Sequence, residues 1–498
     1  MSFFSTRGNC CVTASQAILR GLAEDGGLYV PSMFPVVPLE KACALGQLPY
    51  PRRAAEILKL YLEDFSSGEI DHAVDAAYGP DRFSDPAVAP LKPLDDGTWV
   101  LELFHGPTLA FKDIALQLLP HLTALSARKN GESREVSILV ATSGDTGKAA
   151  LEGFRDVPGT SCTVFYPLDG VSDVQRLQMV TTGGSNTHVI AVRGNFDDAQ
   201  TGVKELFTSS AFASEMAARG RILSSANSIN FGRLVPQVVY YFSAYADLVA
   251  RRAIVSGDPV NFCVPTGNFG NILAGFYARQ MGLPIGRLIC ASNRNNVLTD
   301  FFNSGIYTTH RVFFKTISPS MDILVSSNLE RLLFEVSDRD GELVRTWMRL
   351  LKECGSYSVG DQRREWLEGI FWGGCADDHD TLEEIGRRFR QDHYLMDPHT
   401  AVASAVLRQY RLARADRTPT VLVSTASPYK FSRDVLAGIS GGEKGGVPDP
   451  FACSEELEKL SGIAMPEQVR RLKDLPVRHR AECEKDAMGA AVLREFDA

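Results

Sequence analysis

The stretch Val136-Ser-Ile-Leu-Val-Ala-Thr-Ser-Gly-Asp-Thr-Gly-Lys-Ala-Ala-Leu151 reads as a strand, a turn and the start of a helix. Its first residues are apolar and partly β-branched, which is typical of a strand buried on both faces. The Gly-rich middle breaks the strand, and the alanines after it favour a helix. Strand, turn and helix in this order form the repeating unit of an α/β fold.

The same order of elements recurs along the chain. Between the expected strands lie stretches of helical period, the first with Ile114, Leu118 and Leu122 on one face. Strands that alternate with helices predict a largely parallel sheet, which binds ligands at the carboxyl ends of its strands. The expected strands are Trp99–Phe104, Val136–Thr142, Cys162–Tyr166, His188–Val192, Val260–Val264, Arg287–Ala291 and Thr420–Ser424.

The pattern also suggests how the chain divides. Residues 1–95 have few strand signals and are expected to form a separate N-terminal domain. Residues 96–440 would form the α/β core, interrupted by a charged helical insertion at about residues 328–396. Residues 441–498 would form a linker rich in Gly and Pro, followed by a charged helical tail.

Composition sets the broad class of protein. Of 498 residues, 44% are hydrophobic and 22% are charged, as is ordinary for a soluble globular protein. The 60 acidic and 52 basic side chains are spread along the chain, so no nucleic-acid partner is expected. The apolar runs are too short to span a bilayer, and the first residues lack the pattern of a leader. We therefore expect a cytoplasmic protein with no membrane partner.

Ten cysteines raise the question of a metal site or of disulfides. Cys10 and Cys11 are adjacent, and the spacing Cys-x-x-Cys does not occur. Cys375 and His379 have ligand-like spacing, but no second pair accompanies them. We expect reduced thiols and no metal site.

The first segment with chemical potential is His105-Gly-Pro-Thr-Leu-Ala-Phe-Lys-Asp113, which follows the first expected strand. Gly106 would break that strand, so Lys112 lies at a strand-to-helix junction with Phe111 before it. Burial near apolar groups lowers the pKa of a lysine and makes its free amine usable, as a Schiff base requires. A lysine at a helix start is more often simply solvated, so this segment alone does not decide the function.

The turn in the opening stretch is close to a nucleotide-binding P-loop. That loop requires a Gly five positions before its second Gly, and a Ser or Thr after the Lys. Thr142 and Ala149 occupy those positions, so the nucleotide hypothesis fails. What remains around residues 143–146 is a nest of amides and hydroxyls that suits an anion such as a carboxylate.

Two more segments follow expected strands. In Val264-Pro-Thr-Gly-Asn-Phe-Gly-Asn271, the glycines allow close backbone approach, and the start of the next helix favours a phosphate. The dinucleotide pattern G-x-G-x-x-G is absent there.

The strand Thr420–Ser424 ends in residues with hydroxyl groups. Either Ser424 or Thr425 could therefore face a ring nitrogen, or both could merely cap a turn.

Together these four segments resemble the threonine synthase family of the long-chain type, within the fold-type II pyridoxal-phosphate enzymes. The resemblance implies an α/β fold with mostly parallel twisted sheets flanked by helices, an N-terminal domain and a helical insertion. Further matching motifs follow in order along nearly the whole chain: Gly21–Pro31, Gln175, Gln178-Met179, Gly194–Gln200, Asn227–Asn230 with Arg233 and Gln237, Ser318–Asp322 and Asp397–Ala401.

The resemblance implies a role for each matching residue. Lys112 would hold pyridoxal 5′-phosphate as a Schiff base and move protons. The cofactor phosphate would be held by Gly267, Asn268, Phe269, Gly270 and Asn271, and the pyridine nitrogen by Thr425. The amino-acid part of the substrate would be bound by Ser143, Gly144, Asp145 and Thr146. The leaving phosphate would be bound by cations drawn from Lys148, Arg233 and Lys430, whereas Arg294 is expected to be a surface residue.

The implied reaction converts O-phospho-L-homoserine and water into L-threonine and phosphate, by γ-elimination and β-addition of water. Ser427 and Tyr429 stand where many relatives have His and Ala, Lys148 where many have a small residue, and Asn271 where many have Asp. A phospho-lyase that releases 2-oxobutanoate therefore stays open, as does a non-catalytic binding protein, which the intact Lys112 disfavours. The molecule is expected to be a monomer or a homodimer.

Overall fold

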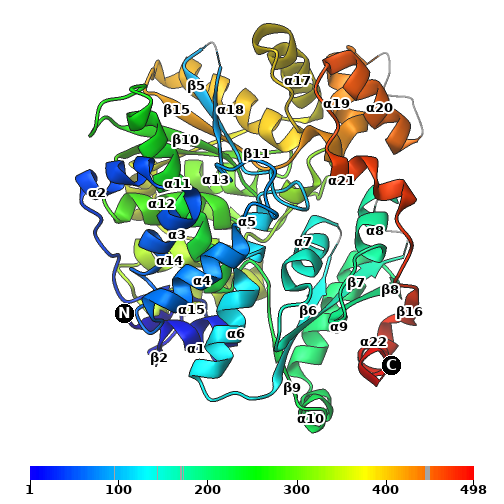
Figure 1. Ribbon diagram of the computed structural model, residues 1–498. Coiled ribbons are helices and arrows are strands. Elements are labelled where there is room, and N and C mark those ends of the chain that lie inside the picture. The colour runs from blue at the N-terminus through cyan, green and yellow to red at the C-terminus, as the bar shows by residue number, and fades with distance from the viewer. Residues whose placement is uncertain (95, 143, 169–170, 172, 443–448, 498) are drawn as a thin grey trace.

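The computed structural model describes residues 1–94, 96–142, 144–168, 171, 173–442 and 449–497. Two sheets organise the chain, a six-stranded one in the upper left of Figure 1 and a five-stranded one at its lower right. The larger sheet has the strand order β14 (Phe371–Cys375), β11 (Ile285–Ser292), β10 (Val260–Pro265), β15 (Thr420–Ser424), β5 (Thr98–Glu102) and β4 (Leu91–Pro93). The smaller has the order β16 (Ala481–Glu484), β8 (Thr187–Arg193), β7 (Thr160–Pro167), β6 (Glu135–Ala141) and β9 (Arg221–Ser224).

All neighbouring strands of these two sheets run parallel except β4 and β5. Each of the seven strands expected from the sequence is present, so the predicted α/β class with mostly parallel sheets is confirmed. β14 was not expected, because it lies in the region taken for a helical insertion. Its sequence Phe-Trp-Gly-Gly-Cys contains two glycines and no β-branched residue, so it gives a weak strand signal.

Helices cover both sheets. α11 (Phe231–Ala250) is buried on nearly all sides, as an almost uniformly apolar helix has to be. On the side of the larger sheet lie α5 (Lys112–Leu116), α12 (Gly270–Gln280), α13 (Val297–Ser304), α18 (Pro398–Arg414) and α19 (Ser432–Ile439), whereas α6 (Leu119–Lys129) contacts β6 and β7 of the smaller sheet. Around the smaller lie α7 (Asp145–Phe154), α8 (Asp173–Val180), α9 (Phe196–Thr208), α10 (Ser210–Ala218) and α22 (Met488–Asp497).

The remaining elements belong to the two ends of the chain and to residues 306–392. The N-terminal region contains β1 (Phe3–Ser5), β2 (Cys11–Val12), β3 (Tyr29–Pro31), α1 (Ala14–Arg20), α2 (Leu39–Ala44), α3 (Tyr50–Leu58) and α4 (Ser67–Ala77). Residues 306–392 contain, besides β14, β12 (Ile306–Thr308), α14 (Leu329–Val336), α15 (Gly341–Cys354), β13 (Ser356–Ser358), α16 (Asp361–Glu368) and α17 (Asp378–Asp392). The last segment contains α20 (Pro450–Ser461) and α21 (Glu467–Arg470) before β16.

The last segment crosses from one half of the molecule to the other. In Figure 1 the red chain leaves α21 and descends along the edge of the molecule to β16 and α22. β16 pairs with β8, with Ala481 opposite Ile190, so the tail expected to be helical also completes a sheet. Residues 443–448 of the expected linker lie outside the described part of the chain.

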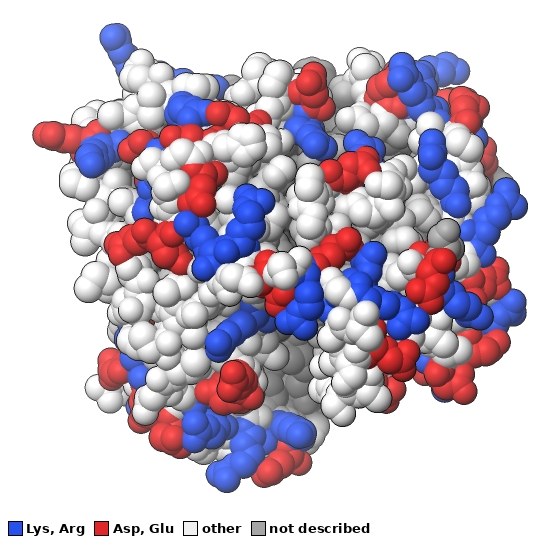
Figure 2. Space-filling model, turned by 60° about the horizontal axis from the view of Figure 1, so that its bottom comes forward, with Lys and Arg blue, Asp and Glu red and all other residues white. Residues whose placement is uncertain are grey.

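The surface carries both signs of charge. On the face drawn in Figure 2, Lys and Arg side chains are interspersed with Asp and Glu.

Among the described residues, no helix has both the length and the apolar character needed to cross a membrane.

Candidate active site

Lys112 is the first residue of α5, at the end of the loop that follows β5. Its Nζ lies 5.2 Å from the centre of the Phe111 ring and 3.7 Å from Asp145 Oδ2. Burial lowers the pKa of Lys112; the nearby Asp145 opposes this effect, and the positive charges of Lys430 and Arg233 add to it. The structure therefore gives Lys112 the environment that a reactive free amine needs.

Asp145 joins the two halves of the site. It is the first residue of α7, beside the smaller sheet, and accepts from Lys430 Nζ at 2.8 Å. Burial alone would raise the pKa of Asp145, but Lys430 and Lys112 hold it well below its usual range. A carboxylate with a lowered pKa thus lies between two lysines that the sequence places 318 positions apart.

The turn before α7 is shaped by Thr142, whose Oγ1 accepts from the N–H groups of Gly144 and Gly147 at 3.0 Å each. Gly144 has φ of 154°, and a Cβ there would come within 2.3 Å of Gln175 Nε2. Only glycine suits that position. Thr146 follows in the first turn of α7 and is partly exposed. Ser143, also predicted to bind the substrate, lies outside the described residues.

Lys430 lies in a short 3₁₀ helix after β15 and has a side-chain exposure of only 3%. Besides Asp145, it donates to the backbone oxygen of Thr108 at 2.7 Å. Thr108 in turn donates through its N–H and Oγ1 to Asp113, at 2.8 and 2.7 Å. Lys430 thereby fixes the loop that carries Lys112.

Arg233 is a buried cation in the first turn of α11. Its Nη1 donates to Ala226 O at 2.8 Å, whereas its Nε is buried without a hydrogen-bond partner. Burial lowers its pKa to about 10. Among the described residues, no carboxylate forms an ion pair with Arg233, so this guanidinium is available to an anion that enters the site.

The loop between β10 and α12 forms a cradle of backbone amides. Within the described chain, no group accepts from the N–H groups of residues 267–271. Phe269, the N-cap of α12, has φ of 65° and ψ of −2°, a left-handed conformation that an L-residue avoids unless its surroundings impose it. A Cβ at Gly267 would come within 2.6 Å of Ser320 O, so this loop packs against the 318–322 segment.

Asn271 adds a side-chain donor to the cradle. The hydroxyls of Tyr240 and Tyr241 donate to its Oδ1, at 2.7 and 2.9 Å. These bonds orient the amide and leave its Nδ2 buried without a partner. Unpaired backbone amides, a buried unpaired Nδ2 and the start of α12 together fit the phosphate of pyridoxal phosphate.

The structure distinguishes the two hydroxyls at the end of β15. Ser424 Oγ lies 2.9 Å from Thr400 Oγ1, on the α18 side of the strand. The hydroxyl of Thr425 has no hydrogen-bond partner among the described residues, although the residue is buried. Thr425, whose backbone oxygen accepts from Phe111 N at 2.8 Å, is therefore the better candidate for a ring nitrogen.

The side chain of Lys148 forms an ion pair of its own, separate from Lys112, Arg233 and Lys430. Its Nζ donates to Glu152 Oε1 at 2.6 Å and to Thr182 Oγ1 at 2.9 Å, and Arg155 supports the same carboxylate at 3.0 Å. The spacing i, i+4 on α7 accounts for the pair. This ion pair favours a structural role, and the contribution of Lys148 to phosphate binding stays a prediction. Lys430 is also paired, with Asp145, but its charge and that of Arg233 act on Lys112, so these two are the better candidates for the second anion site.

Lys148→Met should therefore act on stability and not on catalysis. We expect turnover to change by less than about twofold, and the free energy of unfolding to fall by about 1–3 kcal/mol, since Glu152 loses a charged hydrogen-bond partner. Urea denaturation and steady-state turnover check both values. A turnover lowered about tenfold at unchanged stability would return Lys148 to the phosphate site.

Some residues of the site were given no role from the sequence. His399 is buried, holds Asp397 Oδ2 through Nδ1 at 2.6 Å and accepts from Ser320 N at 3.1 Å, so it fixes the segment next to Gly267. Tyr240 and Tyr241 orient Asn271. The only signal for the tyrosines is a pair of hydroxyls within an otherwise apolar helix.

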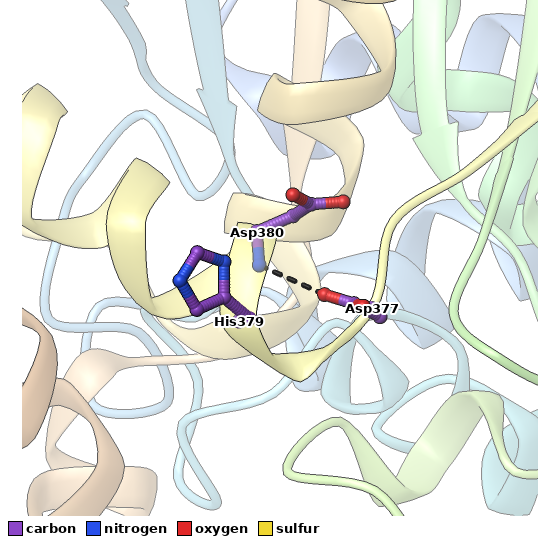
Figure 3. A group of neighbouring side chains, drawn as sticks. All are labelled: Asp377, His379 and Asp380. Carbon is purple, nitrogen blue, oxygen red and sulfur yellow. Dashed lines mark hydrogen bonds between the residues drawn. The ribbon is translucent and has the colours of Figure 1, made fainter.

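A separate group of possible metal ligands lies away from this cluster. Asp377, His379 and Asp380 place one ligand atom each within 4.8 Å of one another at the start of α17 (Figure 3). Asp377 already serves as N-cap and accepts from Asp380 N at 2.9 Å. Cys375, which the spacing linked to His379, lies outside the group, with Sγ 3.9 Å from Asn296 Nδ2. An N-cap accounts for this geometry.

Comparison with known proteins identifies relatives over the whole chain. Family models match residues 2–78 (threonine synthase N terminus), 88–354 (pyridoxal-phosphate dependent enzyme) and 400–481 (threonine synthase, C-terminal). A threonine synthase of Pseudomonas aeruginosa is 40% identical over 482 residues, which cover 96% of this chain and 98% of that protein.

Solved structures agree with this result. A pyridoxal-phosphate-bound threonine synthase from Brucella melitensis superposes with a TM-score of 0.88 at 37% identity and covers 100% of both chains. A threonine synthase from yeast has a TM-score of 0.88 at 31% identity, with coverage of 100% of this chain and 99% of the other. The family models and these relatives show that the chain belongs to the threonine synthase family of pyridoxal-phosphate-dependent lyases.

Proposed function

We propose that the chain converts O-phospho-L-homoserine and water into L-threonine and phosphate. The observation that carries this proposal is Arg233, a buried guanidinium whose charge also acts on Lys112 and which no described carboxylate neutralises. A buried cation without a counter-ion is unfavourable, and a phosphorylated substrate would supply the missing charge. The amide cradle supports a second, separate phosphate site for the cofactor.

The residues that would hold the cofactor surround the larger sheet. Lys112 would bind its aldehyde, the N–H groups of residues 267–271 and Asn271 Nδ2 its phosphate, and Thr425 its ring nitrogen. Bound pyridoxal phosphate supplies the electron sink that stabilises negative charge on carbons near the substrate amine. Residues 144–146, at the start of α7, would bind the amino-acid part of the substrate.

Lys112 would move the protons of the reaction. Protons leave Cα and Cβ, and one proton each is returned to Cγ and Cα. The bond between Cγ and the phosphate oxygen breaks, and the hydroxyl of water adds at Cβ. The remaining proton of water balances the charge of the departing phosphate. Because burial lowers the pKa of Lys112, the unprotonated amine that accepts these protons is easier to form.

Arg233 and Lys430 would hold the phosphate as it leaves. Expulsion from Cγ concentrates charge on the departing group, so cations aimed there stabilise the transition state more than the bound substrate. Asp145 keeps Lys430 in place through the 2.8 Å ion pair. Its own negative charge would be directed toward the substrate amine and Lys112, and away from the phosphate.

The proposed reaction predicts the product. Purified enzyme given O-phospho-L-homoserine should release threonine and phosphate in about equal amounts, and chromatography of the amino acids with a phosphate assay measures both. If 2-oxobutanoate and ammonia accompany the phosphate in place of threonine, the chain is a phospho-lyase. The proposed proton transfers by Lys112 would then still hold, whereas the proposed addition of water at Cβ would be wrong.

The oligomeric state and the cytoplasmic location of the protein stay predictions.

A further inference from the structure

The carbonyl groups of the phosphate loop are held from outside the loop. Asn268 O accepts twice from Asn328, from its backbone N at 3.1 Å and from its Nδ2 at 3.0 Å. Gly267 O accepts from Ser326 Oγ at 2.7 Å. Asn328 is fully buried, at the N-cap of α14. Two consecutive carbonyls are therefore held by one short segment, residues 326–328, where the region expected to be an insertion begins.

The position of a carbonyl determines where the next amide points. In a planar trans peptide, C=O and the following N–H point in opposite directions. When Ser326 and Asn328 hold the carbonyls of residues 267 and 268, the N–H groups of Asn268 and Phe269 point to the other side of the loop. No described group accepts from these two N–H groups, so they are available to an anion. The same bonds hold Phe269 in its left-handed conformation.

Asn328 is itself oriented by Arg331. Arg331 Nη1 donates to Asn328 Oδ1 at 2.6 Å, so the amide must direct its Nδ2 to Asn268. The Arg331 side chain is completely buried, and its other nitrogens donate to the backbone oxygens of Tyr29 at 2.9 Å and Ile229 at 2.5 Å. Ile229 belongs to the loop before Arg233. One guanidinium thus links the amide cradle to the start of α11.

We propose that Asn328, oriented by Arg331, is a positioning residue for the cofactor phosphate: by holding Asn268 O it turns the amides of the loop into the cradle. Asn328 does not touch the cofactor. It contributes by keeping the N–H groups of the loop pointed at the phosphate site even when no anion is bound. A loop without this support would have to be ordered each time the phosphate binds, at a cost in binding free energy. The inference rests on the proposed use of the Gly267–Asn271 loop for the cofactor phosphate.

Two variants of Asn328 separate positioning from folding. Asn328→Asp keeps an oxygen for Arg331 and gives that buried guanidinium a carboxylate, but it removes the side-chain donor to Asn268 O and leaves only the backbone N–H. Asn328→Ala removes the same side-chain donor without adding charge. Holoenzyme is dialysed against decreasing concentrations of pyridoxal phosphate, and the bound fraction is read from its visible absorbance. Thermal unfolding of each protein is measured in parallel.

A matched control is Asn186→Ala. Asn186 Nδ2 also donates to backbone carbonyls, those of Phe154 and Thr160 at 2.8 Å each, but beside the smaller sheet. This variant should lose stability and keep the cofactor affinity of the wild type.

We expect both Asn328 variants to raise the dissociation constant of the cofactor about tenfold. Asn328→Asp should do so without a loss of thermal stability, which a purely structural role would not produce. Dissociation constants within about twofold of the wild type for both variants would overturn the inference, as would weakening by Asn328→Asp alone, because charge would then explain it. Failure of the wild type to bind the cofactor would instead contradict the proposed use of the loop.

Discussion

Lys112→Ala is expected to lower turnover by at least about 10³-fold, because one side chain both holds the cofactor and moves the protons. The visible absorbance of the bound cofactor should be lost as well. The environment supports this size of effect: Lys112 is buried, with Asp145 at 3.7 Å and two further cations near enough to lower its pKa. Absorbance spectra and phosphate release from O-phospho-L-homoserine check the two results.

The control for this variant is Lys129→Ala. Lys129 lies at the end of α6 and pairs with Glu69 at 2.8 Å near the surface, so its loss should leave spectrum and turnover unchanged. Turnover that persists in Lys112→Ala at more than about a tenth of the wild-type rate would rule out Lys112 as the proton-moving group.

Arg233→Met is expected to lower kcat/KM for the phosphorylated substrate by about 100-fold or more, the usual effect of removing one donor to a developing anion. The fold should tolerate the change, because methionine fills much of the same space and removes a buried charge that lacks a carboxylate partner. Thermal stability that holds or rises while activity falls is typical of a residue placed for function. Steady-state kinetics and thermal unfolding test this pair of results.

A suitable comparison is Arg251→Met, at the other end of α11. Arg251 donates to Leu91 O at 3.1 Å and is exposed, so its loss should not affect the kinetics. If Arg233→Met keeps normal kinetics and instead loses the cofactor, Arg233 serves the cofactor phosphate, and the assignment of the two anion sites is wrong.

The fold class and most of the site could be predicted from local patterns. Buried strands and the segments at their carboxyl ends are properties of short stretches, so Lys112, Asp145 and the Gly267–Asn271 loop could be found one segment at a time. The edge strand β14 was missed because two glycines replace the residues that signal a strand. The ion pair of Lys148 could also have been predicted from the sequence, since Glu152 lies one helical turn further on.

Other features depend on contacts that no local pattern encodes. The amide of Asn271 takes its orientation from two tyrosines some 30 positions earlier in the chain. Asn328 lies 60 positions from the carbonyl that it holds, in a region whose composition indicates only helices. That Arg233 lacks a carboxylate partner is a property of the whole interior, which no single segment of the sequence reveals.

The crossing of the last segment to the smaller sheet has a consequence for biosynthesis. β8 has β16 as its outer neighbour, and the two are also joined by Arg193 and Glu482, 289 positions apart, at 2.7 Å. At about 5–20 residues per second, a ribosome needs about 15–60 s to make the chain between them. Throughout that interval the open edge of β8 has unpaired backbone groups, which invite pairing with another nascent chain. The smaller sheet therefore stays incomplete until nearly the whole chain has been made, and chaperones that cover the open edge of β8 would prevent such pairing.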